Sequence, residues 1–109
     1  MKITQKFFSV ATVETCTGDT LHLKCPEQEM IVMKKAELGR MESGTCIHSN
    51  RYIGCTNEIR FLLDEMCSGR ESCQSNVPSR EMKQVNTKCE DFLEIYLRVE
   101  YICIRGRYH

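Results

Sequence analysis

The chain has 109 residues, eight of which are cysteines, and its fifteen basic residues balance its fifteen acidic ones, so the formal net charge is zero. This length fits one domain with a modest core. The absence of a basic excess disfavours nucleic acid as a partner, and no apolar run in the sequence approaches the ~20 residues of a membrane-spanning helix.

The cysteine content indicates a disulfide scaffold made in an oxidising, extracellular compartment. A metal module is disfavoured, because the shortest cysteine spacing runs from Cys67 to Cys73 and the chain has only three histidines. We therefore expect disulfides, no bound metal and no cofactor. Residues 7–11 are too short an apolar run for a signal peptide, so we expect an excised domain of a larger multidomain protein that is secreted or membrane-anchored.

The first clearly patterned strand is predicted for residues 21–24. Apolar Leu21 and Leu23 alternate with polar residues there, which is the period of a half-buried strand. Pro26 ends it, because proline donates no hydrogen bond to a sheet. Residues 8–15 before it are interpreted as either an opening strand or an ordered lead-in.

A second, more buried strand is predicted for the apolar run from Met30 to Met33. Lys34, Lys35 and Glu37 after it are interpreted as a solvated turn, and Gly39 as the residue through which the chain leaves the strand. Residues 42–55 are predicted to be a loop, since turn-forming residues recur along them.

An amphipathic helix is predicted after this loop. Its apolar stripe has helical spacing and consists of Ile59, Leu62, Leu63 and Met66. Thr56 or Asn57 is expected to cap its start, and Ser68-Gly69 is expected to stop it.

The last third of the chain contains a short and a long predicted strand. Residues 74–77 form the short one, and the polar residues 79–89 form a loop with a helical turn expected at 80–84. The long strand runs from Ile95 to Cys103, where apolar residues again alternate. Residues 104–109 are interpreted as a tail or linker stub.

Several of these motifs resemble the rhamnose/galactose-binding lectin family, whose domains occur in sea-urchin and fish-egg lectins and in receptor ectodomains such as latrophilins. Cys16-Thr17-Gly18 resembles the family's opening Cys-Glu-Gly, and Leu38-Gly39-Arg40 resembles its Tyr-Gly-Arg. The last strand resembles the closing Lys-Tyr-Leu-Glu-Val-x-Tyr-x-Cys. The resemblance covers residues 15–103, which leaves residues 1–14 as a lead-in segment.

The resemblance implies a small α+β fold, in which antiparallel strands pack with one main helix and disulfides pin long loops. Spacing alone leaves the cysteine connectivity open. By similarity to the family we expect the pairs Cys16–Cys46, Cys25–Cys103, Cys55–Cys89 and Cys67–Cys73. The second pair is expected to join two strands that are partners in one sheet.

The family's sugar contacts come from four places, and the resemblance implies that most are replaced here. The glutamate becomes Thr17, the tyrosine becomes Leu38, the Asp-Pro-Cys loop becomes Thr87-Lys88-Cys89, and the lysine becomes Ile95. Gly39, Arg40 and Tyr96 match and are interpreted as mainly architectural. A charged hydrogen bond contributes ~1.5–3 kcal/mol, whereas millimolar binding is only about 4 kcal/mol. These replacements therefore disfavour a simple sugar.

No catalytic motif is present, so we expect no enzyme. We expect a recognition module of an extracellular receptor or adhesion protein that binds a protein partner, since Leu38 favours protein contact over sugar contact. The expected partner surface comprises Thr17, Leu38, Gly39, Arg40, Lys88, Glu90 and Tyr96. Two alternatives remain open: a spacer domain, or a lectin for galactose, rhamnose or another cell-surface glycan. Lys34, Lys35, Arg40 and Lys88 would form a basic rim for an acidic glycan.

Overall fold

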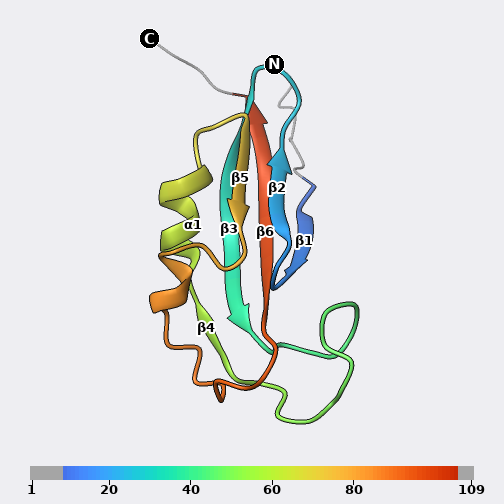
Figure 1. Cartoon of the computed structure of the whole chain (residues 1–109). Helices are drawn as coiled ribbons and strands as arrows, with labels where there is room; N and C mark the ends of the chain where they lie inside the picture. The colour runs from blue at the N-terminus through green and yellow to red at the C-terminus, as the bar shows by residue number, and fades with distance from the viewer. Residues whose placement is uncertain (1–8, 106–109) are drawn as a thin grey trace.

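The computed structural model describes residues 9–105. Its centre is a four-stranded antiparallel sheet in which β6 lies between β1 and β3, and the short β4 pairs with the other edge of β3 (Figure 1). The strands of this sheet are β1 (Ala11–Cys16), β3 (Glu29–Gly39), β4 (Thr56–Glu58) and β6 (Tyr96–Arg105). Helix α1 (Arg60–Cys67) packs against β3.

A second sheet has two antiparallel strands, β2 (Thr20–Lys24) and β5 (Ser72–Asn76). The prediction that residues 21–24 and the last strand are partners in one sheet is therefore wrong. The Cys25–Cys103 disulfide connects the end of β2 with β6 across the two sheets. Apolar faces explain this arrangement, because each sheet has one apolar face and buries it against the other.

The core lies between the two sheets and α1. Leu21 and Leu23 of β2 are buried in it together with Leu97 and Val99 of β6. The polar residues that alternate with them on β2 are exposed, so the predicted half-buried strand is confirmed. Leu63 brings the apolar stripe of α1 into the same cluster.

The predicted helix is confirmed, but its predicted start is wrong. Residues 56–58 form β4 instead of a cap, because they pair with Glu37 to Gly39 of β3. Ile59 stands at the N-cap position, where its amide donates to the carbonyl of Ala36 at 2.8 Å. The amide of Arg60, the first residue of the helix, donates to the side chain of Glu58 at 3.1 Å, so a residue of β4 accepts one of the amides that have no partner within the helix. The helix ends at Ser68-Gly69 as predicted, and Gly69 has a φ of 88°.

Strand β3 is longer than the predicted run from Met30 to Met33. Lys34, Lys35 and Glu37 belong to the strand and not to a turn, and its register with β6 shifts between Met33 and Lys35. Charged residues are accommodated because one face of this sheet meets solvent and the bulge changes the alternation. The strand does end at Gly39, where a Cβ atom would lie 2.3 Å from the carbonyl oxygen of Cys55.

The two ends of the chain also differ from prediction. An opening strand is present, but it begins at Ala11 and not at residue 8, which lies outside the described residues. Strand β6 continues to Arg105 because residues 104 and 105 pair with the start of β3. The remainder of the predicted tail, residues 106–109, lies outside the described residues.

All four expected disulfides are formed, namely Cys16–Cys46, Cys25–Cys103, Cys55–Cys89 and Cys67–Cys73. The first and third fasten the segment from residue 40 to residue 55, which has neither helix nor strand, as predicted. The short strand and the helical turn of the last third are also confirmed, with the turn η1 at Met82–Gln84. The chain is thus a disulfide-rich α+β domain.

Candidate functional site

Two of the predicted site positions meet although 78 residues separate them. Thr17 directly follows β1 and Ile95 directly precedes β6, and these strands pair so that Cys16 lies opposite Tyr96. The Thr17 hydroxyl donates a hydrogen bond of 2.6 Å to the carbonyl oxygen of Ile95. The positions at which the family resemblance places a carboxylate and an ammonium group are therefore neighbours here, occupied by a hydroxyl group and an apolar side chain.

Leu38 lies in the core and does not face solvent. Its side chain is 1% exposed, and it pairs with Leu97 of the neighbouring strand. The expectation that Leu38 presents an apolar contact to a protein partner is therefore wrong. The inward face of β3 buries it.

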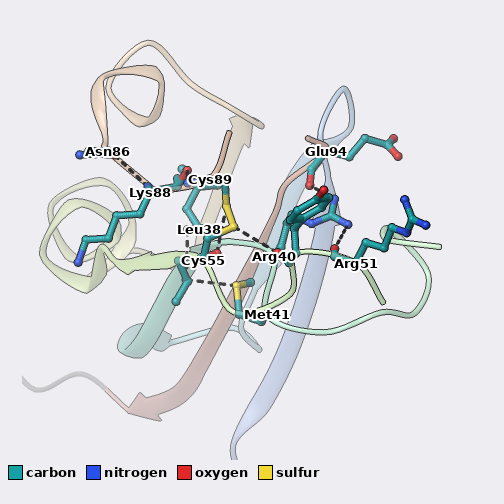
Figure 2. The surroundings of a disulfide bond; sticks show 12 residues. Leu38, Arg40, Met41, Arg51, Cys55, Asn86, Lys88, Cys89 and Glu94 are labelled. Atoms are coloured by element: carbon teal, nitrogen blue, oxygen red, sulfur yellow. Dashed lines mark hydrogen bonds between the residues drawn. A yellow bond between two sulfur atoms is a disulfide. The ribbon is translucent and has the colours of Figure 1, made fainter. Parts of the chain in front are cut away.

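Arg40 is a buried clamp between two loops (Figure 2). It is 4% exposed, and its guanidinium donates to the carbonyl of Glu94 at 2.7 Å and to that of Arg51 at 2.8 Å. Its backbone amide donates to the carbonyl of Cys55 at 2.8 Å, and its carbonyl accepts from Gly54 at 2.7 Å. Arg40 therefore does not contact a partner itself, and its effect on the exposed surface comes from holding these two loops in place.

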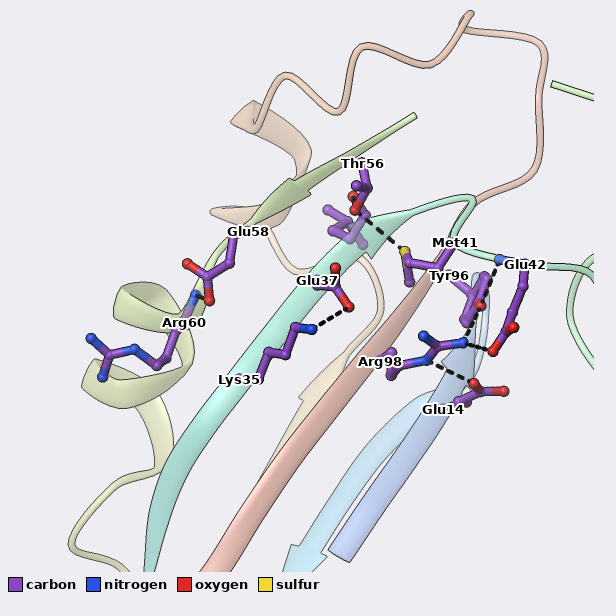
Figure 3. Close-up of polar contacts among 11 residues, drawn as sticks. Glu14, Lys35, Glu37, Met41, Glu42, Thr56, Glu58, Arg60, Tyr96 and Arg98 are labelled. Carbon is purple, nitrogen blue, oxygen red and sulfur yellow. Dashed lines mark hydrogen bonds and ion pairs between the residues drawn. The ribbon is translucent and has the colours of Figure 1, made fainter. Parts of the chain in front are cut away.

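Tyr96 is likewise buried, at 2% exposure, and joins β6 to the start of the long loop. Its hydroxyl accepts hydrogen bonds from the amide of Glu42 at 3.2 Å and from Arg98 at 3.1 Å. Arg98 also pairs with the carboxylates of Glu14 and Glu42 (Figure 3). Burial raises the pKa of the Tyr96 hydroxyl. Burial alone would lower the pKa of Arg98, but its contacts with Glu14, Tyr96 and Glu42 raise it.

The other predicted site residues, Lys88 and Glu90, are exposed. Lys88 has a left-handed backbone with a φ of 67°, and its amide donates to the side chain of Asn86 at 2.9 Å. Its side chain points away from the adjacent Cys55–Cys89 disulfide (Figure 2). The structure thus divides the predicted surface into exposed Thr17, Lys88 and Glu90 and buried Leu38, Gly39, Arg40 and Tyr96.

The basic rim proposed for an acidic glycan is not formed. Lys34 and Lys35 lie on the exposed face of β3, where Lys35 pairs with Glu37 at 3.7 Å. Arg40 is buried and its guanidinium contacts backbone carbonyls. These cations therefore do not surround one ligand.

A pocket of about 180 Å³ opens beside Ile95, and sequence reasoning missed it. Its lining residues include Met82, Val85, Thr87, Glu90, Leu93 and Ile95. Phe92 lies in the turn that forms part of its wall, and this side chain is 76% exposed. The one feature of the sequence that could have indicated this pocket and its turn is an aromatic residue among carboxylates, in Glu90-Asp91-Phe92-Leu93-Glu94.

Among residues 9–105, no group of histidine, cysteine, aspartate or glutamate side chains is placed to hold a metal ion. No helix in this described part of the chain is long and apolar enough to cross a membrane.

No curated protein sequence matches the chain significantly. Residues 23–103 match the D-galactoside/L-rhamnose binding SUEL lectin domain, a span from β2 to the last disulfide-bonded cysteine. The match supports a carbohydrate-binding lectin module, and it covers well over half of the chain. The chain therefore belongs to the D-galactoside/L-rhamnose-binding SUEL lectin domain family.

Proposed function

We propose that this domain is a non-catalytic recognition module of an extracellular receptor or adhesion protein, and that its partner is a protein and not free galactose or rhamnose. The observation that carries this proposal is the contact between the Thr17 hydroxyl and the Ile95 carbonyl. It occupies the place where the family resemblance implies the charged sugar contacts.

This contact leaves a monosaccharide with few partners. The Thr17 hydroxyl already donates its proton within the fold, and Ile95 offers an apolar side chain in place of an ammonium group. Each lost charged hydrogen bond costs ~1.5–3 kcal/mol, and binding at millimolar affinity has only about 4 kcal/mol in total. Two such losses remove most of the affinity of an ordinary sugar site.

The adjoining pocket supports the same proposal. At about 180 Å³ it is smaller than the ~300–1,000 Å³ of typical small-molecule sites. Met82, Val85, Leu93 and Ile95 form an apolar part of its wall, and Lys83, Glu90 and Asp91 add charged groups beside it. A pocket of this size and character suits one side chain of a protein partner, since anchoring side chains commonly fill such pockets at interfaces.

The extracellular setting is supported by the four disulfides, which persist in oxidising compartments. The non-catalytic character is supported by the family match and by the sequence, which has no catalytic motif.

Glycan binding is the second candidate, and the family match favours it. Glu90 and Asp91 line the pocket, and their carboxylates could accept hydrogen bonds from sugar hydroxyls. A glycan bound in this way would use a rebuilt site that does not include Leu38 or Arg40, because both are buried.

The test is an NMR titration of the oxidised, isotope-labelled domain with L-rhamnose and D-galactose, with D-glucose as the control sugar. We expect no saturable shifts up to concentrations on the order of tens of millimolar. Saturable shifts of Thr17, Ile95 and Tyr96, or of Glu90 and Asp91, with rhamnose or galactose and not with glucose would show a functioning sugar site and overturn the proposal.

A further inference from the structure

We propose that the turn from Glu90 to Glu94 anchors the protein partner through Phe92, and that the partner presents an aliphatic side chain flanked by arginine or lysine. This inference rests on the proposed function, because it assigns the surface and the chemistry of the partner. It places recognition at the pocket and the neighbouring turn instead of at the positions where the family resemblance implies sugar contacts.

The location of Phe92 distinguishes it from other exposed apolar residues. A single exposed aromatic needs no explanation by itself, and Phe61 on α1 is 67% exposed. Phe92, however, is flanked in sequence by Asp91 and Leu93, which both line the pocket. Phe92 itself does not line the pocket, but the turn that carries it forms part of the pocket wall, so a partner side chain that enters the pocket would lie close to this turn.

The turn that carries Phe92 is held in place on both sides. The amide of Leu93 donates to the carbonyl of Glu90 at 3.0 Å, and the carbonyl of Glu94 accepts from Arg40 at 2.7 Å. Cys89, just before the turn, is bonded to Cys55. A surface fixed in this way loses little conformational entropy when it binds, which raises affinity.

The charges around Phe92 select a basic partner. Residues 89–94 contain three carboxylates, those of Glu90, Asp91 and Glu94, and no basic residue. None of the three takes part in an ion pair within the described residues 9–105. Lys83 is the basic residue of the pocket lining. A guanidinium or ammonium group is attracted both to carboxylates and to the face of a phenyl ring.

The apolar part of the pocket wall suits an aliphatic side chain of the partner. Its wall includes Met82, Val85, Leu93 and Ile95, and its volume of about 180 Å³ suits a single side chain such as leucine. Burial of that side chain supplies the hydrophobic contribution, and the flanking cations fix its orientation over the acidic turn. The partner is thus a protein segment with leucine-like and arginine-like residues side by side.

The test uses the blocked peptide Gly-Arg-Leu-Arg-Gly as the probe, titrated into the oxidised domain and followed by NMR. A peptide in which citrulline replaces both arginines is the neutral control. We expect saturable shifts confined to residues 82–95, with binding weakened roughly threefold or more by Phe92→Ala and by the citrulline replacement. Phe61→Ala, the matched exposed phenylalanine on α1, should bind as the wild type does.

Equal peptide affinity of the wild type and Phe92→Ala would overturn this inference, as would shifts that lie outside residues 82–95 or no shifts at all. Phe92 is exposed, so its replacement should leave the rest of the spectrum unchanged and loss of folding is directly visible. Sugar-specific shifts at Thr17 count against the proposed function, whereas a peptide response that is absent, or that is the same in the wild type and Phe92→Ala, counts against this surface alone.

Discussion

At the scale of single residues, Arg40 shows how a buried charge organises an exposed surface. Its guanidinium reaches the carbonyls of Arg51 and Glu94, which lie in two loops with exposed aromatic residues. The side chains that face solvent in these loops are Tyr52 and Phe92. Arginine suits this position because its planar fork has several fixed donors, whereas lysine has one donor centre.

We therefore predict that Arg40→Lys destabilises the domain by about 1.5–3 kcal/mol, since at least one charged hydrogen bond is lost. Amide hydrogen exchange of residues 50–54 and 91–95 should become faster, which NMR can follow. The control is Arg60→Lys, because Arg60 forms an exposed ion pair with Asp64 that contributes little. Unchanged protection of both loops in Arg40→Lys would contradict the clamp.

Tyr96 gives a second prediction at this scale, which concerns alkaline pH. Burial raises the pKa of its hydroxyl above the value in the unfolded chain. Its contribution to stability is therefore complete below pH of about 10 and is lost as pH rises through the pKa in the folded state. Urea unfolding across this range should show the wild type losing stability faster than Tyr96→Phe. Parallel losses in the two proteins would contradict this assignment.

At the scale of elements, the helix and strands with a periodic apolar pattern could be predicted from the sequence, whereas the pairing of one strand with another could not. The alternation of Leu21 and Leu23 and the stripe of α1 predicted these elements because each pattern reports one buried face. The charged part of β3 was missed because a bulge interrupts its alternation. The start of α1 was misplaced because residues 56–58 pair with β3, and such a non-local partner has no local signal.

The end of β3 supports a prediction of its own. Gly39 has a φ of 155°, and a Cβ atom there would lie 2.3 Å from the Cys55 carbonyl oxygen, which is backbone and cannot rotate away. Gly39→Ala should therefore cost about 1–3 kcal/mol or more. Gly44→Ala is the matched control, because nothing lies within 4 Å of its Cβ position. Chemical denaturation of both variants should separate them, and equal stabilities would refute the close approach.

At the scale of the whole molecule, we expect the disulfides to contribute unequally to the free energy of unfolding. Cys25–Cys103 joins the two sheets across a sequence separation of 78, whereas Cys67–Cys73 closes a separation of only 6. Loop-closure entropy then predicts about 4–5 kcal/mol for the first and about 2 kcal/mol for the second. Urea unfolding of the two double alanine variants measures this difference. Equal losses would mean that chain entropy does not dominate.

The candidate functional site also depends on the whole fold, and only part of it could be predicted from the sequence. Thr17 and Ile95 were both identified from the family resemblance, but their contact depends on the register of β1 with β6. The burial of Leu38 and Arg40 depends on which face of the sheet and which loops cover them. The pocket beside Ile95 and the exposure of Phe92 were not predicted, because a single aromatic residue in a charged loop has no periodicity that would indicate its surroundings.

The central claim, that this domain recognises protein and not glycan, is tested most directly on cell surfaces from its source. The measurement is binding of a fluorescent multimer of the oxidised domain to intact cells, before and after mild periodate oxidation of glycans and, separately, after trypsin digestion. Multimers raise weak single-site binding to a measurable level. We predict that binding survives periodate and is lost after trypsin, with Phe92→Ala reducing it and Phe61→Ala leaving it unchanged. Binding that is lost after periodate and survives trypsin would contradict the claim.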